Sequence, residues 1–560
     1  MNPDKKSAGA GATGSSPLAQ ALIKPQQLEK SAPCCHSCAT GGDVRGWIAL
    51  VAQREKLGLT EEEALTNAWH KITEINPFPS TLGRICPHPC ESGCNRKEKD
   101  GAVAINALER FLGDWGLSQQ LTLGQLDKEP KLESIGVIGA GPAGLSFAYQ
   151  MARRNYQVTI YEKEEKPGGM LYYGIPQYRL PKEIIDAEIQ RILDLGVDLK
   201  LNVSIGKDIK VHQLKEKHDA MFLGIGAGRG LNLGIPGEAG TNVWTGTEYL
   251  GCLNRNEAVA LGSDVIVIGG GNTAVDAARS ARRSGARVTI LYRRTRKEMP
   301  AIDSEIDDAI EEGISIEYLT APVEIIRHNG MVKALVVQRM ELKEPDNSGR
   351  RKPVPLPGSK YELAADSVIT AVSQEPEWDM LTELNPGSTW IQPMEYGKMD
   401  DNLWAGGDSL GLGIAGMAIA QGRQAAEAVH SQLRGLVQPF ASGQTAVPQN
   451  MIKADFHPEK PPAKPHQHPA EERLAKVQME VLETISRSEF LEEVARCFSC
   501  GLCYGCDNCF MYCNAGGFTR LEQVSPGAYF AMSREYCVGC GKCIDLCPSG
   551  FLNPSGVGPG

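Results

Sequence analysis

The stretch ESIGVIGAGPAGLSFAYQMARRNYQVTIYEKEE, residues 133–165, combines an apolar strand, a glycine turn, an amphipathic helix and a second strand. Gly139 is expected to make the tight turn, Gly141 to let the backbone approach a pyrophosphate, and Gly144 to allow close packing of helix on strand. The phosphates would lie at the helix N-terminus, where free N–H groups and the helix dipole favour an anion. The second strand ends at Glu162, a carboxylate that can bind ribose hydroxyls. The stretch therefore predicts a dinucleotide-binding fold.

The same pattern restarts in SDVIVIGGGNTAVDAARSARRSGARVTILYRR, residues 263–294, so two nucleotides are expected, FAD in the first unit and NADP(H) in the second. The second unit ends in Tyr292 and two arginines, where the first has a glutamate. Guanidinium groups can pair with a 2′-phosphate that a carboxylate would repel, which favours NADP(H) over NAD(H). The alternative is that the arginines are a solvated strand end, and NAD(H) also stays possible. The residues assigned to this nucleotide are Gly269, Gly271, Asn272, Ala274, Arg293 and Arg294.

The composition indicates a soluble globular protein, because 42% of the 560 residues are hydrophobic and 22% are charged. A net charge of -10 argues against nucleic-acid binding, which leaves a basic footprint. No apolar run approaches the roughly 18 residues of a membrane span, and the first residues lack the apolar region of an export signal, so we expect a cytoplasmic location. The 17 cysteines bunch near the two ends of the chain, which favours metal ligation over a disulfide framework.

The order of motifs resembles that of the glutamate synthase small-subunit family of flavoprotein reductases, from about residue 33 to residue 435. The landmarks are CPHPCESGC, INALERF, GAGPAG, KPGGMLYYGIPQYRLPK, GGGNTAVDAAR, YRRTRKEMPA and AGGD. The resemblance implies that Gly168, Gly169 and Met170 lie along the flavin. It also implies that Gly407 and Asp408 close the FAD site, with the carboxylate on the ribityl chain.

Two [4Fe–4S] clusters in the N-terminal part would also follow from the resemblance, but the first cysteine run, PCCHSCATGGD, departs from the family spacing. Seven candidate ligands are available for eight positions, so the sequence supports one or two clusters. We expect one cluster on Cys34 or Cys35 with Cys38 and Cys94. A second would use Cys86, Cys90 and Glu109 and leave one position open, for which the candidates are His36, Asp43 or the spare member of the Cys34–Cys35 pair.

Ten cysteines near the C-terminus predict two further [4Fe–4S] clusters, because Cys537, Cys540, Cys543 and Cys547 with Pro548 have the spacing of bacterial ferredoxins. Cys513 would join the first three of these, and Cys547 would complete the set of Cys503, Cys506 and Cys509. An alternative register begins with Cys497, Cys500 and Cys503. Two thiols are surplus, and the sequence does not say which. Cys252 is expected to be a small buried side chain.

These patterns predict an α/β protein with two Rossmann-like dinucleotide-binding domains, for FAD and NADP. A helical iron–sulfur domain would precede them and a bacterial ferredoxin-like domain would follow. The expected divisions are a disordered N-terminus (1–30), the helical iron–sulfur domain (31–125), the FAD-binding domain in two parts (126–250 and 371–436), the NAD(P)-binding domain (251–370), a Pro-rich linker (437–475) that could let the last domain move, and a helix with the ferredoxin-like domain (476–560).

The expected function is transfer of electrons between NADP(H) and a partner redox enzyme through FAD and [4Fe–4S] clusters, in either direction, with no catalytic acid or base required of the protein. The added ferredoxin domain is similar to that of the oxidoreductase associated with sulfite reductase and of subunits serving 2-oxoacid:ferredoxin oxidoreductases. The resemblance therefore implies such an enzyme, or free ferredoxin, as the partner, in a hetero-oligomeric complex. The alternatives are a glutamate synthase small subunit or a non-catalytic electron-wiring subunit.

Overall fold

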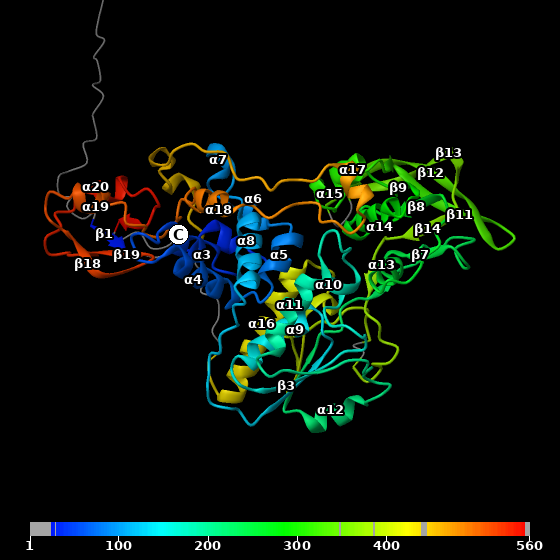
Figure 1. Ribbon diagram of the computed structural model, residues 1–560, viewed down its shortest axis with the longest axis horizontal. Helices are drawn as coiled ribbons and strands as arrows, with labels where there is room; N and C mark the ends of the chain where they lie inside the picture. Colours follow the sequence, from blue (N-terminus) through cyan, green and yellow to red (C-terminus); the bar gives the residue numbers. More distant parts are fainter. Residues whose placement is uncertain (1–23, 28–29, 346–348, 385–386, 438–444, 555–560) are drawn as a thin grey trace, which may run out of the picture.

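The computed structural model describes residues 24–27, 30–345, 349–384, 387–437 and 445–554. Most of the lead-in expected to be disordered, residues 1–30, lies outside them. Residues 25–27 depart from the expectation, because β1 (Pro25–Gln27) pairs antiparallel with β20 (Leu552–Pro554). The backbone groups of β1 are satisfied by a strand that composition alone does not reveal. The two ends of the described chain therefore lie side by side (Figure 1).

The first dinucleotide unit lies in a six-stranded sheet of order β16-β17-β5-β2-β3-β4. All neighbouring pairs except β16 with β17 are parallel, as expected for a doubly wound sheet. Helices α9 (Pro142–Ala152) and α16 (Ala415–Arg434) pack together beside it, and Gly422 allows this because a Cβ there would overlap with the Ala143 carbonyl. The strands are β2 (Ser134–Ile138), β3 (Gln157–Tyr161), β4 (Asp198–Lys200), β5 (Ala220–Leu223), β16 (Lys398–Asp400) and β17 (Leu403–Ala405).

The second dinucleotide unit forms a separate parallel sheet of order β10-β9-β8-β14-β7. Its strands are β7 (Val243–Thr245), β8 (Asp264–Ile268), β9 (Arg287–Tyr292), β10 (Ser315–Tyr318) and β14 (Ser367–Thr370), with helices α13 (Gly246–Asn254), α14 (Asn272–Arg283) and α15 (Asp303–Glu311). An antiparallel sheet of β11 (Thr320–His328), β12 (Met331–Pro345) and β13 (Arg351–Ala364) extends from it. The predicted pair of Rossmann-like domains is therefore confirmed.

The N-terminal part is helical, and its helices form where the sequence supplies caps and apolar faces. Thr60 and Glu63 form a capping box at the start of α4, whose inner face buries Leu65 and Trp69. Phe111 of α8 stacks on Phe490 from the far end of the chain, with ring centroids 4.3 Å apart. The helices are α2 (Pro33–Ser37), α3 (Val44–Ala52), α4 (Glu61–Thr73), α5 (Pro79–Ile85), α6 (Pro89–Ser92), α7 (Lys97–Asp100) and α8 (Ile105–Ser118).

The C-terminal cysteine-rich part is a small domain built on the hairpin of β18 (Phe518–Ser525) and β19 (Ala528–Met532), with the short helices α19 (Asn508–Met511) and α20 (Lys542–Asp545). It packs against the helical part rather than standing apart from it. Tyr529 donates to Gln53 Oε1 at 2.6 Å, and Lys56 Nζ donates to the carbonyls of Tyr504 and Gly505 at 2.9 Å. In Figure 1 this domain lies at the end of the molecule opposite the second dinucleotide unit.

The described part of the Pro-rich segment, from residue 445, is docked, so the expectation of a linker that frees the last domain is wrong for these residues. Figure 1 shows it running from the helical part to α17 (Ala470–Ala475), beside α14, and back to α18 (Arg487–Val494). Arg473 of α17 is buried and pairs with Glu312 and Asp308 of the second unit. The helix expected at the start of the last division, 476–560, is confined to α18. Residues 476–486 cross between domains, and Val481 N donates to the Tyr178 carbonyl.

His218 is buried in the first dinucleotide unit, where its ring packs against Gly136 of β2 and bonds Ser134 Oγ at 2.7 Å and Tyr161 Oη at 3.0 Å. Burial lowers its pKa from 6.5 to about 4. The unfolded chain therefore binds more protons between these values, and the free energy of unfolding falls as the pH is lowered from 6.5 to 4.

We expect the free energy of unfolding of His218→Gln to fall by roughly 3 kcal/mol less than that of the wild type over this pH range. The measurement is the free energy of urea unfolding at pH 7 and pH 4.5 in wild type and variant. His212→Gln is the control, because His212 is exposed on α12 (Val211–Lys217). An unchanged pH dependence in the His218 variant would contradict the assignment.

In the described part of the chain, no helix is both long enough and apolar enough to cross a membrane.

Candidate redox cofactor sites

The first glycine turn leaves no room for side chains. Gly139 has φ +98°, and a Cβ there would lie 2.5 Å from the Gly224 carbonyl oxygen. A Cβ on Gly144 would overlap with the Gly139 carbonyl, so α9 approaches β2 as closely as the backbone allows. Gly141 is the N-cap of α9. The turn therefore presents bare backbone and free N–H groups at the carboxyl end of β2, which fits a pyrophosphate.

Glu162 lies at the end of β3, beside this turn. Its buried carboxylate accepts from Ala140 N at 2.6 Å and from Glu164 N at 2.9 Å, and burial raises its pKa. The segment of Gly168, Gly169 and Met170 also reaches the turn. Gly168 N donates to the Ala140 carbonyl at 2.7 Å, and a Cβ on Gly169 would lie 2.9 Å from Gly141 Cα.

Gly407 and Asp408 lie beside the start of α9, the helix that follows this turn. A Cβ on Gly407 would lie 3.0 Å from Ala143 Cβ, and its φ is +76°. Asp408 accepts from Gly413 N at 3.2 Å, and burial raises its pKa to about 6. The structure thus brings together all the residues that the sequence assigns to FAD. The bare backbone of the turn, together with the carboxylates of Glu162 and Asp408, fits that cofactor.

The second glycine turn is equally tight. A Cβ on Gly269 would overlap with the Ala371 carbonyl, and one on Gly270 would lie 2.5 Å from the Tyr292 ring. Ala274 is fully buried in α14, as its packing role predicts. Asn272, the first residue of α14, accepts from Ile302 N at 3.0 Å, so its side chain holds the loop before α15.

The two arginines after β9 have different surroundings. Arg293 is exposed, whereas Arg294 is 3% exposed and its Nε donates to the Arg351 carbonyl at 2.8 Å. Burial raises the pKa of Tyr292, while the charges of Arg294, Arg350 and Arg293 act to lower it, which places all three guanidinium groups near this ring. The second turn is therefore flanked by positive charge, as a nucleotide phosphate requires.

The first cysteine group, the inner site, consists of Cys38, Cys86, Cys90 and Glu109. Burial raises the pKa of the Cys86 thiol to about 12, and the nearby Glu109 and Cys38 add to this effect. Burial likewise raises the pKa of Cys90, with further contributions from Glu109, Cys38 and Cys86. Glu109 accepts from Asn76 Nδ2 at 2.9 Å, and burial raises its pKa to about 7.

The second cysteine group, the junction site, consists of Cys34, Cys94, Cys497 and Cys500, which line one cavity. This differs from the expected grouping in two respects. Cys38 belongs to the inner site, because its charge acts to raise the pKa of Cys86 and of Cys90. Cys497 and Cys500 supply the remaining two thiols of the junction site. Their spacing had also allowed them to be ligands in the ferredoxin-like domain. Cys35 lies beside the cavity, and its thiol donates to Asp43 Oδ1 at 3.5 Å.

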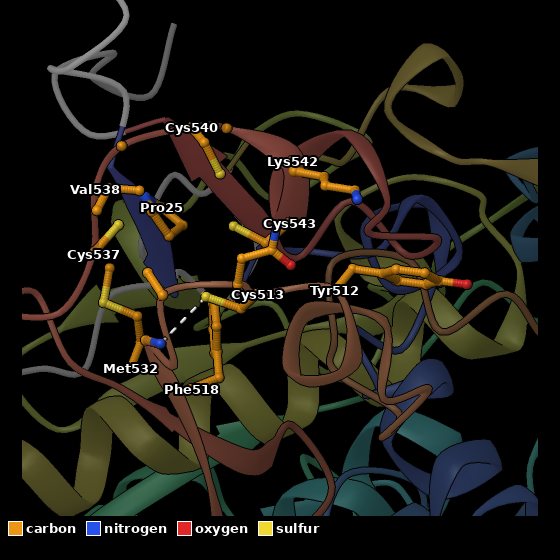
Figure 2. A pocket seen from close by; sticks show the side chains of 15 residues that line it. Pro25, Tyr512, Cys513, Phe518, Met532, Cys537, Val538, Cys540, Lys542 and Cys543 are labelled. Atoms are coloured by element: carbon orange, nitrogen blue, oxygen red, sulfur yellow. Dashed lines mark hydrogen bonds between the residues drawn. The ribbon is translucent and has the colours of Figure 1, made fainter.

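The last eight cysteines form two groups, as the sequence expects. Burial raises the pKa of Cys503 to about 11, with contributions from Cys506 and Cys547, and these three also raise that of Cys509. We name this set the proximal site. The distal site is shown in Figure 2, where the sulfurs of Cys513, Cys537, Cys540 and Cys543 surround one pocket. Gly517 N donates to Cys513 Sγ at 3.2 Å.

Comparison with known proteins places the two dinucleotide units in a family. A family model described as pyridine nucleotide-disulphide oxidoreductase matches residues 133–427. The chain belongs to this family. Residues 27–121 match a domain described as dihydropyrimidine dehydrogenase domain II, 4Fe-4S cluster, and residues 532–553 match a 4Fe-4S binding domain. The chain is therefore an iron–sulfur member of a family of FAD-dependent NAD(P)H oxidoreductases.

Three curated relatives show where in the pyridine nucleotide-disulphide oxidoreductase family the chain lies. The beta subunit of NADP(+)-dependent formate dehydrogenase from Moorella thermoacetica is 37% identical over 76% of this chain and 63% of its own. The beta subunit of NADPH-Fe(3+) oxidoreductase from Geobacter sulfurreducens is 38% identical over 63% of this chain and 52% of its own. The small chain of glutamate synthase [NADPH] from Azospirillum brasilense is 31% identical over 71% of this chain and 86% of its own.

The chain thus spans about half to two-thirds of the length of the first two relatives, and most of the length of the third. The resemblance to the glutamate synthase small subunit is confirmed, as are FAD, NADP(H) and [4Fe–4S] clusters as cofactors.

The spacing of the cysteines in this family member fits clusters better than single metal ions. Among the described residues, His466, His468 and Glu483 form the one group of three or more His, Cys, Asp or Glu side chains whose ligand atoms all lie within 4.8 Å of one another. Four thiolates around one zinc ion would lie about 3.8 Å apart, given Zn–S bonds of about 2.3 Å. None of the four cysteine groups gathers three ligand atoms within 4.8 Å of one another, so they are not arranged around a single zinc ion.

Proposed function

We propose that the chain is an NADP(H)-dependent iron–sulfur flavoprotein oxidoreductase subunit that exchanges electrons between NADP(H) and a protein redox partner. The balanced reaction is NADPH plus two oxidised one-electron acceptors giving NADP⁺, H⁺ and two reduced acceptors, or its reverse. FAD, when bound, supplies the exchange between the two-electron chemistry of a nicotinamide and the one-electron chemistry of clusters. The protein supplies the binding sites, their order and the exclusion of water.

One observation carries the proposal: the loop that follows the inner-site residue Cys38 contacts the domain that holds the residues assigned to FAD. The loop after Cys38 packs on the start of α16. This helix follows Gly407 and Asp408 in the chain. A Cβ on Gly416 would lie 3.0 Å from Ala39 Cβ, and Arg423 Nη2 donates to the Thr40 carbonyl at 3.5 Å. A ligand of the first cluster is therefore held directly against the flavin-binding domain. Residues Gly139, Gly141, Gly144, Glu162, Gly168, Gly169, Met170, Gly407 and Asp408 would bind FAD.

The partner is proposed to be a protein that accepts or supplies single electrons, such as a 2-oxoacid:ferredoxin oxidoreductase, a sulfite reductase or a free ferredoxin. The ferredoxin-like domain supports this, because its distal site lies at the molecular surface. Cys540 is exposed, and so are Tyr536 and Val538 beside it. The formate dehydrogenase and Fe(3+) oxidoreductase relatives are themselves named as subunits. This supports a hetero-oligomeric complex.

The test is anaerobic reduction of iron-replete protein by NADPH and by NADH, followed by flavin bleaching and by reduction of added ferredoxin. We expect NADPH to bleach the flavin and the ferredoxin to be reduced next. Bleaching without ferredoxin reduction would leave the glutamate synthase small subunit as the better description. If neither nucleotide bleaches the flavin, the chain is a wiring subunit and the proposal fails.

Arg293 is the residue proposed to recognise the 2′-phosphate, since it is exposed beside the second turn while Arg294 is buried. We expect Arg293→Ala to raise the KM for NADPH by about tenfold or more and to leave that for NADH unchanged, because a charge-assisted hydrogen bond contributes about 1.5–3 kcal/mol. Arg294→Ala is the matched control. It should affect both nucleotides alike, through the loss of its bond to Arg351. If Arg293→Ala, like Arg294→Ala, raised the KM for NADH as much as the KM for NADPH, Arg293 would not contact the 2′-phosphate.

A further inference from the structure

We propose that Cys34 and Cys94, from the N-terminal helices, and Cys497 and Cys500, from the other end of the sequence, bind one [4Fe–4S] cluster at the junction site. The chain would then hold four such clusters. The junction cluster would connect the inner site with the proximal and distal sites of the ferredoxin-like domain. This inference rests on the proposed function only in taking the cysteine groups as cluster sites.

The C-terminal pair is presented as ligands by its local structure. Cys497 and Cys500 form a C-x2-C turn whose residue Ser499 has φ +51°, an unusual value for a side chain other than glycine. Ser499 N donates to Cys497 Sγ at 3.4 Å, and Asn95 Nδ2 donates to Cys500 Sγ at 3.5 Å. Hydrogen bonds to sulfur are how proteins stabilise cluster thiolates and set their potentials.

The N-terminal side supplies the other half of the cavity. Cys34 projects from α2, and Cys94 lies next to Asn95, whose side chain bonds Cys500. The apolar side chains of Ile48, Val103, Ile105 and Phe498 form part of the remaining lining. These side chains limit the access of water to a cluster held by the four thiols.

Two arginines lie buried at the junction site, and one of them, Arg96, pairs with Asp100 at 2.6 Å. Arg45 and Arg96 both line the cavity and are 5% and 2% exposed. Arg45 Nη1 donates to the carbonyls of Lys30 at 2.6 Å and Cys500 at 2.9 Å, which ties the segment before α2 to the C-terminal ligand. Arg96 donates to the Arg496 carbonyl and lies 5.0 Å from the Phe498 ring.

The segment just before the C-terminal pair is fixed to the N-terminal part by buried polar contacts. Glu493 accepts from Ala104 N at 2.8 Å and Ala463 N at 2.7 Å. Arg496 is 2% exposed and donates to the carbonyls of Gly101 at 2.8 Å and Ala102 at 3.0 Å. These contacts between protein groups hold the C-terminal pair beside Cys34 and Cys94, so ligation does not depend on a chance approach of a mobile tail.

The ligand spacing places the junction site between the other groups. Four pairs of cysteines spaced four residues apart divide between neighbouring sites. They are Cys34 with Cys38, Cys90 with Cys94, Cys509 with Cys513, and Cys543 with Cys547. Cys500 of the junction site and Cys503 of the proximal site are three residues apart, so their Cα atoms lie within about 11 Å, given 3.8 Å per residue. The order of sites is therefore inner, junction, proximal and distal.

The decisive measurement is the iron and acid-labile sulfide content of the full-length wild-type chain after anaerobic reconstitution to saturation. Four clusters require about sixteen irons per chain, four for each cubane. Twelve or fewer at saturation would overturn the proposal. This count needs no nucleotide and no partner. Sixteen irons without NADPH oxidation would therefore retain the inference while the proposed function fails, and twelve irons with NADPH oxidation would do the reverse.

Variants identify which thiols share the cluster. We expect Cys497→Ser and Cys94→Ser each to remove the same component of the EPR spectrum of the reduced protein and to lower the iron content by about four per chain. Cys90→Ser should remove a different component, that of the inner site. Cys252→Ser is the control and should retain all the iron, since Cys252 lies in α13, outside every group. Unchanged iron in Cys497→Ser, or different components lost in Cys497→Ser and Cys94→Ser, would overturn the assignment. Should a variant fail to fold, the wild-type iron count still decides.

Discussion

Gly139→Ala is expected to lower the flavin content of the purified chain to below about a tenth of the wild-type value. The alanine Cβ would lie 2.5 Å from the Gly224 carbonyl oxygen, and the backbone has φ +98°, which L side chains rarely adopt. The unfavourable backbone conformation alone costs about 1–3 kcal/mol. The clash must in addition displace the turn that approaches the pyrophosphate. Because each 1.4 kcal/mol is a factor of about ten in affinity, the two effects together exceed tenfold.

Gly285→Ala is the matched control for this change. Gly285 has the same φ of +98°, but a Cβ there would meet no heavy atom within 4 Å. The control therefore carries the conformational cost without the clash, and it lies in the other dinucleotide unit. The readout is the ratio of flavin absorbance to protein in gel-filtered samples. Equal flavin loss in the two variants would show that backbone strain alone acts, and full retention in Gly139→Ala would remove this turn from the FAD site.

The glycine turns could be predicted from the sequence because their geometry depends on residues close in the chain. The strand, the turn and the helix are contiguous, so Gly139, Gly141 and Gly144 define one another's positions. Gly407 and Asp408, which are also assigned to FAD, are distant in sequence from this turn. Only the family resemblance indicated them. Position alone does not fix chemistry either. The adjacent Arg293 and Arg294 read alike in the sequence, yet one is exposed and the other is buried against the Arg351 carbonyl.

The grouping of the cysteines shows where prediction from spacing stops. In the ferredoxin-like domain each site draws on short runs with a known exchange of the fourth ligand, and the expected grouping agrees with the structure. The junction site instead depends on how α18 packs against the helical part, through Phe490 and Arg496. No local pattern encodes that contact. The same reason explains the docked segment before α18, whose prolines and charges read as a solvated linker although Arg473 is buried by a partner in another domain.

Glu312→Gln is expected to destabilise the second dinucleotide unit by about 3–5 kcal/mol, the usual cost of removing one partner from a buried ion pair. Glu312 is 1% exposed and accepts from Arg279 at 2.7 Å, Arg283 at 2.9 Å and Arg473 at 3.4 Å. Burial acts to raise its pKa, but the hydrogen bonds and charges of Arg279 and Arg283 outweigh burial and lower it. The stabilisation that ionised Glu312 gives to the fold is therefore fully present above its ordinary pKa of 4.5. It is lost as the pH falls through the lowered pKa of the folded state.

The measurement for Glu312→Gln is hydrogen–deuterium exchange at pH 7, because local opening is resolved there segment by segment. We expect protection of α14 and α15 to fall by about a hundredfold or more, since each 1.4 kcal/mol is a factor of about ten, and α17 to lose protection with them. Glu311→Gln is the control. Glu311 also pairs with Arg473, at 2.7 Å, but its side chain is 57% exposed, so its loss should cost less than about 1 kcal/mol. Comparable effects of the two changes would mean that the surface pair, and not the buried carboxylate, holds the docked segment. Exchange that rises in α17 alone would mean that Glu312 anchors the segment without stabilising the nucleotide-binding unit.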